Sequence, residues 1–100
     1  MSPRFIETKR SELARICVEH DISYHGLFGS YARGEQRPDS DVDLLVDFSV
    51  KKSLFGVAAA QLDFEDELHR KVDLVIRRSI KKPRLIANIN RDLVTLYERS

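Results

Sequence analysis

Two aspartates separated by a single residue, Asp41 and Asp43, are the side chains in this sequence best placed to do chemistry. In an extended strand, residues two apart project from the same face, with Cα atoms about 6.5–7 Å apart. Two carboxylates held that close repel each other unless a cation lies between them. Mg²⁺ prefers oxygen ligands and commonly takes one or two carboxylates together with substrate phosphates. The pair therefore fits a magnesium and phosphate site, although taken alone it is more often a solvated strand face.

A glycine–serine pair, Gly29-Ser30, precedes the two aspartates by one short loop and directly follows a stretch of strand character. Glycine lets the backbone turn sharply toward an anion, and backbone N–H groups and a serine hydroxyl can donate to phosphate oxygens. A lone Gly-Ser pair is common in turns, so its meaning comes from the nearby aspartates. Arg33 lies one helical turn beyond Ser30, and it would either reach a phosphate or be an ordinary surface arginine.

A third carboxylate, Asp73, interrupts the apolar run Val72-Asp73-Leu74-Val75-Ile76. A buried carboxylate without a partner is costly, so the run predicts a nearby partner or a metal ion. The simpler alternative is an aspartate that caps a strand end. On a neighbouring strand, Asp73 would complete a site for two metal ions about 3.5–4 Å apart. It would then act as a general base or as a ligand of the second ion.

The other polar candidates are less specific. A basic segment follows the Asp73 run, and it would attract a triphosphate or an acidic partner surface, or simply form a solvated loop. Its members are Arg77, Arg78, Lys81, Lys82 and Arg84. The three histidines show no metal-ligand spacing, and Cys17, the only cysteine, is expected to be an inert core residue rather than a reactive thiol.

The elements that must hold these residues follow from the spacing of the apolar side chains. A helix is predicted over residues 4–20, and Ser53 is the expected N-cap of a second helix that ends near His69. The buried face of that second helix is expected to comprise Leu54, Val57, Ala58, Leu62 and Leu68. Strands are predicted over 22–28, 41–48 and 72–76, with one helical turn over 30–33 and a last helix from Pro83. Residues 93–97 would extend that helix or form an edge strand.

Alternation along 41–48 predicts which side chains share a face of the strand. One face carries Val42, Leu44, Val46 and Phe48, and the other carries Asp41, Asp43, Leu45 and Asp47. Helices and strands that alternate along the chain predict an α/β fold, with helices packed on a small mixed β-sheet. One hundred residues are enough for a single domain, which is taken to span 1–100.

Composition argues against several other classes of protein. With 42% apolar and 33% charged residues, the sequence is that of a folded chain with an ordinary polar surface. The net charge of +1 gives no overall attraction to membranes or nucleic acid, so no direct nucleic-acid binding is expected. No apolar run resembles a signal peptide or reaches the roughly 20 residues that span a bilayer, and we expect a cytoplasmic protein.

The segment from Gly29 to Asp43 fits the pattern Gly-Ser, ten residues, Asp-x-Asp. It resembles the signature of the minimal nucleotidyltransferases, the MNT group within the DNA polymerase β-like superfamily. The flanks Leu27-Phe28 and Leu44-Leu45-Val46 are also similar to that family, as is the downstream Arg70-Lys71-Val72-Asp73-Leu74-Val75. The resemblance extends over about residues 7–97. His69 departs from the pattern, because relatives often have glycine before the basic pair.

The resemblance implies the polymerase β-like nucleotidyltransferase fold and a specific reaction. Chains of this length are similar to the antitoxins of HEPN/MNT toxin–antitoxin pairs, which transfer AMP from ATP to a tyrosine of the HEPN ribonuclease toxin. Carried over, Asp41 and Asp43 would hold Mg²⁺, with Asp73 as the third carboxylate and two ions expected. Gly29 and Ser30 would bind the triphosphate. The expected partner is a HEPN toxin in a type VII-like pair, joined to this chain in a hetero-oligomer.

Two other functions stay open. The chain would be a binding module that neutralises a toxin by forming a complex, although a pure binder has no need of three repelling carboxylates. Alternatively, it would modify a small molecule, as the aminoglycoside nucleotidyltransferases do. Those enzymes carry a further helical domain, whereas the elements predicted here use all of the residues. A macromolecular acceptor that brings its own binding surface is therefore favoured.

Overall fold

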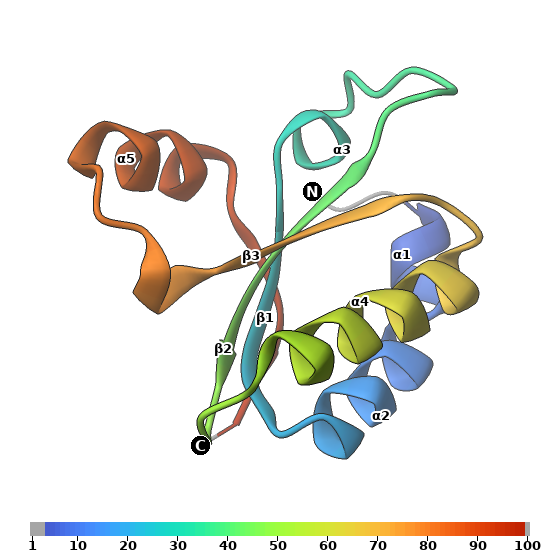
Figure 1. Ribbon diagram of the computed structural model, residues 1–100. Helices are drawn as coiled ribbons and strands as arrows, with labels where there is room; N and C mark the ends of the chain where they lie inside the picture. The colour runs from blue at the N-terminus through green and yellow to red at the C-terminus, as the bar shows by residue number, and fades with distance from the viewer. Residues whose placement is uncertain (1–3, 100) are drawn as a thin grey trace.

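A four-stranded β-sheet forms the centre of the computed structural model, which describes residues 4–99 (Figure 1). The strands are β1 (Ile22–Phe28), β2 (Val42–Phe48), β3 (Val72–Ile76) and β4 (Val94–Glu98), in the order β3-β2-β1-β4. β1 is antiparallel to both β2 and β4, whereas β2 and β3 are parallel. The α/β fold with a small mixed sheet, predicted from the sequence, is confirmed.

Helices cover the two faces of the sheet unequally (Figure 1). One face carries α1 (Arg4–Thr8), α2 (Arg10–Glu19) and α4 (Leu54–Leu68), and the other carries α5 (Pro83–Asp92). The short helix α3 (Ser30–Arg33) follows β1, and the 3₁₀ helix η1 (Arg77–Ser79) follows β3. Within residues 4–99, no helix is both long and apolar enough to cross a membrane.

The alternation along β2 divides the core between the two faces, as predicted. Side chains from β2 that pack beneath α1, α2 and α4 are Val42, Leu44, Val46 and Phe48. Leu45 points the other way and joins Tyr24 and Ile89 beneath α5. Cys17, on α2, packs in the same part of the core as Val42 and Leu44 and is fully buried. Burial raises the pKa of its thiol to about 12. This thiol is therefore an inert part of the core, as expected.

One segment, residues 4–20, differs from the prediction made from the sequence. A second, residues 94–98, decides between two structures that the sequence left open. The single helix predicted over 4–20 is wrong, because α1 and α2 are separated at Lys9. The Thr8 hydroxyl donates to the carbonyl of Phe5 at 3.0 Å, which competes with continued helical bonding, and the Lys9 side chain reaches Glu67 at 2.9 Å. Residues 94–98 form a strand, because they find a free edge of β1 to pair with.

The buried face predicted for α4 is largely wrong. Ser53 is the N-cap, as expected, and its hydroxyl accepts from the Gly56 N–H at 3.1 Å. The residues that face the core are Ala60, Phe64 and Leu68, whereas Leu54, Ala58 and Leu62 face solvent and Val57 is half-buried. Apolar residues occur on both sides of this helix, so periodicity alone did not distinguish the side that packs on the sheet.

Candidate functional site

The β1–β2 hairpin sets where the Gly-Ser turn lies relative to the paired aspartates. Phe28, the last residue of β1, is the partner of Asp43 in the antiparallel register. The chain turns at Gly29 immediately after this pair, and α3 begins at Ser30. The register therefore brings Gly29 and Ser30 beside Asp43.

Gly29 has a backbone conformation that is essentially restricted to glycine, with φ 76° and ψ −154°. Its Cα also lies against the carboxylate of Asp43. A β-carbon added to Gly29 would overlap a carboxylate oxygen and would stand 3.0 Å from Asp43 Cγ. The turn and the packed carboxylate therefore each require glycine at this position.

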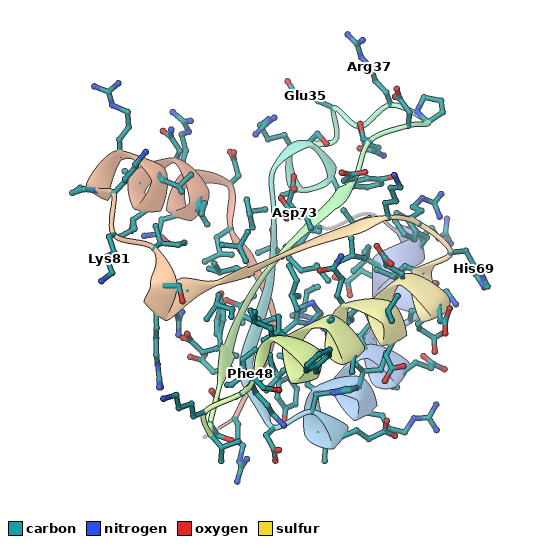
Figure 2. All side chains as sticks on the ribbon, viewed as in Figure 1. Glu35, Arg37, Phe48, His69, Asp73 and Lys81 are labelled. Atoms are coloured by element: carbon teal, nitrogen blue, oxygen red, sulfur yellow. The ribbon has the colours of Figure 1, made fainter. Side chains whose placement is uncertain are left out.

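Asp73 approaches the pair from the neighbouring strand. In the parallel register of β2 and β3 its partner is Asp43, and strands paired this way lie about 4.8 Å apart with partner side chains on the same face. Figure 2 shows Asp73 on β3. The expectation that Asp73 is buried is wrong, because β3 is an edge strand and this end of it is open to solvent. Proximity to Asp43, rather than burial, is what makes Asp73 a candidate.

The three carboxylates influence one another electrostatically. Partial burial, together with the negative charges of Asp73 and Asp41, raises the pKa of Asp43 to about 6. The Arg33 guanidinium opposes the shift. A carboxyl group with such a perturbed pKa, between two other carboxylates, is the kind of group that functional sites contain.

The carboxylates of the site fit a cation whose ligands would come partly from the protein and partly from the substrate. Within residues 4–99, no group of three or more acidic, histidine or cysteine side chains is arranged to hold a metal ion by itself. Mg²⁺ does not need such an enclosure, because it usually keeps several waters and takes one or two carboxylates plus phosphates. Added positive charge would relieve the repulsion around Asp43, and Asp41 is exposed beside it. The residues present therefore fit Mg²⁺ bound with a triphosphate.

Arg33 is occupied by acidic side chains. Its Nε donates to Glu35 at 2.7 Å, and its Nη1 donates to Asp92, at the end of α5, at 2.8 Å. Both ion pairs raise the pKa of Arg33. Arg33 therefore connects α3 to the end of α5, and a phosphate would have to compete with these two carboxylates for it.

An ion pair at the far end of β2 was missed by sequence reasoning. Asp47 is buried, and it accepts from Arg77 Nε at 2.7 Å and pairs with Nη2 at 2.6 Å. The Arg77 guanidinium also stacks on Tyr24, 4.0 Å from the ring centroid. Arg77 is thus engaged by Asp47, and Arg78 Nε lies 3.8 Å from the other Asp47 oxygen, whereas Lys81, Lys82 and Arg84 are exposed. The sequence did contain a sign of this ion pair. Asp47 was predicted to share a face of β2 with Asp43, and a carboxylate that is buried there needs a cation as partner.

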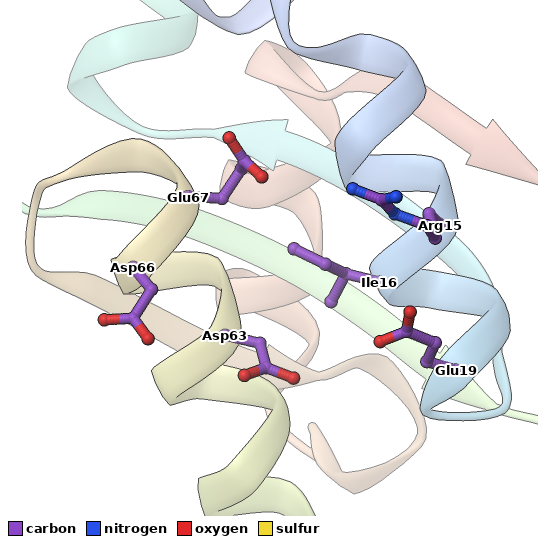
Figure 3. Close-up of a pocket in the computed structure, with 6 residues that line it drawn as sticks. All are labelled: Arg15, Ile16, Glu19, Asp63, Asp66 and Glu67. Atoms are coloured by element: carbon purple, nitrogen blue, oxygen red, sulfur yellow. The ribbon is translucent and has the colours of Figure 1, made fainter.

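A groove of about 310 Å³ lies between α2 and α4, on the face of the sheet opposite α5 (Figure 3). Its lining residues are Arg15, Ile16, Glu19, Asp63, Asp66 and Glu67. Four of the six are acidic, and none belongs to a glycine turn that could bring backbone N–H groups to a phosphate, as Gly29 does beside Asp43. The carboxylates around Gly29 are therefore the better candidate site.

Comparison with known proteins identifies the family of this chain. The model of the family described as polymerase β nucleotidyltransferases matches residues 11–100, which include Gly29 and the three aspartates. The chain belongs to this nucleotidyltransferase family. A solved structure described as a candidate minimal nucleotidyltransferase has a TM-score of 0.79 and 35% identity, and the match covers 94% of this chain and 95% of that one. The fold expected from the resemblance is thus confirmed.

Relatives of this nucleotidyltransferase are named for protein adenylylation. A candidate protein adenylyltransferase of Methanocaldococcus jannaschii is 33% identical over 88 residues, which are 88% of this chain and 90% of that protein. Protein adenylyltransferase MntA of Thermococcus cleftensis is 48% identical over 56 residues, 56% of this chain and 57% of that protein. The structure of a tri-AMPylated Shewanella oneidensis HEPN toxin in complex with MNT antitoxin shares the fold, with TM-score 0.69 and 18% identity over 92% of this chain and 71% of that one.

Proposed function

We propose that this nucleotidyltransferase transfers AMP from ATP to a hydroxyl of a partner protein, a tyrosine of a HEPN toxin, and so acts as its antitoxin. The observation that carries the proposal is the convergence of three carboxylates on a glycine turn that is shaped for close approach. The adenylyltransferase names of the relatives support a protein acceptor. The fold shared with the antitoxin that accompanies a HEPN toxin supports the identity of the partner.

Each element of the site has a separate role in the proposed reaction. The backbone at Gly29 and the start of α3 at Ser30 would bind the triphosphate. Asp41 and Asp43 would hold Mg²⁺, which would supply positive charge against the phosphates and so stabilise the transition state. We assign Arg33 to holding α3 against α5, because Glu35 and Asp92 already occupy its guanidinium.

The reaction is an in-line displacement at the α-phosphorus. The acceptor hydroxyl oxygen forms a bond to this phosphorus, and the bond from the phosphorus to the oxygen that bridges to the β-phosphate breaks, so that pyrophosphate leaves. The hydroxyl proton passes to the carboxylate of Asp73, which is exposed and can be reached by a group on another protein. Because Asp73 lies on an edge strand, a bulky acceptor can approach it without displacing a helix.

The test is the intact mass of the acceptor. A small amount of this chain, incubated with ATP, Mg²⁺ and an excess of the HEPN protein, should add one or more AMP groups to most HEPN molecules. Excess EDTA should abolish the mass increase, because the carboxylates do not hold a triphosphate without a cation. The double variant Asp41→Asn with Asp43→Asn should also abolish it, whereas Asp39→Asn, an exposed aspartate in the same loop, should not.

Two results would contradict the proposal. An unmodified HEPN protein that is fully neutralised by both the parent and the double variant would show that the chain acts by binding alone. Transfer of AMP that is undiminished in EDTA would remove the role assigned to the cation.

A further inference from the structure

The outward face of α4 is apolar, although it points away from the sheet into solvent. Leu54 and Phe55 are each 88% exposed and Leu62 is 60% exposed. Ala58 and Ala59 lie between them and are exposed as well. Solvent-facing sides of helices normally carry charged and polar residues, and contiguous exposed apolar patches mark interaction sites. We call the five residues Leu54, Phe55, Ala58, Ala59 and Leu62 the α4 stripe.

A charged residue of opposite sign lies beyond each end of the α4 stripe. Lys51 is exposed just before the helix, and Asp66 is exposed one turn beyond Leu62. Among the residues that the structure describes, neither has an ion-pair partner. Figure 3 shows Asp66 directed away from α2, while Asp63 and Glu67 on the same helix are directed toward it. The stripe is thus bordered by one unpaired positive and one unpaired negative charge.

Except for Leu54, whose counterpart is Asp63, these residues are arranged symmetrically along the chain. Phe55 and Leu62 are equally far from the midpoint between Ala58 and Ala59, and Lys51 and Asp66 are also equally far from it. In a pair of antiparallel helices related by a two-fold axis at that midpoint, Phe55 of one copy faces Leu62 of the other. Lys51, which lies just before the first turn of the helix, then comes within reach of Asp66 of the other copy at each end. The small side chains of Ala58 and Ala59 allow the two helices to approach closely at the axis.

We propose that the α4 stripe is a homodimer interface, in which two copies of this chain pair their α4 helices antiparallel. Apart from Leu54, the face is self-complementary in both apolar contact and charge, which is the condition for an isologous two-fold interface. A partner of different sequence would need no such symmetry of charge about Ala58 and Ala59.

The dimer leaves the nucleotidyltransferase site accessible. The α4 stripe points away from the sheet on the face that carries α1, α2 and α4. Asp43 and Leu45 lie on the opposite face, which carries α5. The inference therefore does not depend on the proposed reaction. One helix face per copy is a small interface, so the dissociation constant is expected in the micromolar range.

The test is sedimentation equilibrium of the purified chain over about 1 to 500 μM, a range that brackets micromolar affinity. The parent chain should change from monomer to dimer within it. Leu62→Lys should weaken the dimer at least tenfold, because it places a charge in the apolar contact. Leu85→Lys is the matched control, since Leu85 is also exposed but lies on α5, on the other face of the sheet.

Charge exchange tests the antiparallel register itself. Lys51→Glu and Asp66→Lys should each weaken the dimer about tenfold, because each replaces two attractive pairs with two repulsive ones. The double variant should restore the parent dimer, since every Lys51–Asp66 pair is then reversed together. Both positions are exposed, so circular dichroism should show parent-like folding in all variants.

Several results would overturn the proposal. A chain that stays monomeric over the whole range has no such dimer, and a dimer that Leu62→Lys leaves intact uses another surface. A double charge variant as weak as the single variants rules out the antiparallel pairing. If the chain is monomeric and Leu62→Lys instead abolishes binding of the HEPN protein, the α4 stripe binds that partner and not a second copy.

Discussion

Gly29 and Gly34 both have positive φ, yet they differ in what surrounds them. Gly29 packs against the Asp43 carboxylate, whereas a β-carbon on Gly34 would meet none of the described residues within 4 Å. The two glycines at the ends of α3 thus separate the requirement for an unusual backbone conformation from the requirement for space beside the Cα atom. Only the glycine at the candidate site has both requirements.

Gly29→Ala is expected to lose transfer activity by at least about a hundredfold and to lower the free energy of unfolding by about 2–3 kcal/mol. The added methyl group must displace Asp43 as well as strain the turn. Gly34→Ala is the matched control, and it should cost about 1 kcal/mol of stability from backbone strain while keeping most of the activity. Urea unfolding and the mass assay on both variants measure the two effects. Equal losses of activity in the two variants would show that strain alone matters.

Asp43→Asn is expected to abolish transfer without destabilising the protein. The pKa of Asp43 is raised by burial and by Asp73 and Asp41, so the ionised carboxylate opposes folding at neutral pH. Because the group is only half-buried, solvent screening limits the gain on its removal to about 1 kcal/mol or less. Thermal unfolding of the parent and of Asp43→Asn in EDTA measures this gain in stability, with Asp39→Asn as the control variant. A thermal midpoint well below that of the parent would mean that Asp43 is chiefly a structural residue.

The positions of Asp41, Asp43 and Gly29 were predictable because they depend on strand parity and on one hairpin. The exposure of Asp73 was not, because it depends on β3 being at the edge of the sheet. Strand order is a property of long-range pairing, which no local pattern contains. The pairing of Asp47 with Arg77 was missed for a related reason, since it requires the parallel register of β2 and β3.

At the scale of the element, α4 shows what periodicity does and does not determine. Its N-cap and length were predicted, because Ser53 and the end near His69 are local signals. Its buried side was not, because the helix has apolar residues on both sides and the sheet selects one of them. The break at Lys9 does not follow from the apolar spacing either, because it involves the hydrogen bond from Thr8 to Phe5 and the contact of Lys9 with Glu67, which is distant in sequence.

The C-terminal end of α4 gives a prediction at this scale. His69 ends the helix in the left-handed conformation, with φ 53°, which favours glycine. His69→Gly is therefore expected to stabilise the protein by about 0.5–1 kcal/mol, whereas His69→Ala should give no gain. Chemical denaturation of the three proteins measures the difference. A glycine variant no more stable than the alanine variant would show that the cap is not strained in solution.

For the molecule as a whole, the contact between the sheet and its helices contains a buried histidine. His25 is fully buried, with its ring centroid 5.0 Å from that of Phe64 on α4. Neither ring nitrogen has a hydrogen-bond partner among the described residues. Burial, and then the positive charge of Arg10, lower the pKa of His25 to about 4. The folded protein therefore holds this ring in its neutral form.

The stability of the whole molecule should consequently fall in mild acid. The unfolded chain binds a proton at His25 below its ordinary pKa of 6.5, whereas the folded protein does so only near 4. The free energy of unfolding is therefore unaffected by His25 above pH 6.5. As the pH falls from 6.5 toward 4, it decreases by up to about 3 kcal/mol because only the unfolded chain binds the proton. Asp43, with its raised pKa, acts in the opposite direction between its ordinary value of 3.8 and about 6, so both proteins compared should carry Asp43→Asn.

Urea unfolding across this pH range measures the effect, with His25→Leu as the variant that lacks the titrating ring. Its stability should depend less on pH than that of the protein with His25. Parallel curves for the two proteins would show that His25 is not responsible for acid sensitivity.

The β1–β2 hairpin also has a consequence for the order in which the protein folds. It pairs strands that are neighbours along the chain, whereas β4 must return from the other end of the sequence to reach β1. Pairing across a shorter loop loses less chain entropy, so we expect the hairpin to form before β4 docks. Pulsed hydrogen exchange should then protect the amide of Leu44 earlier than that of Leu96, and simultaneous protection would contradict this order. The glycine turn and its aspartates would thus be assembled while the sheet is still incomplete.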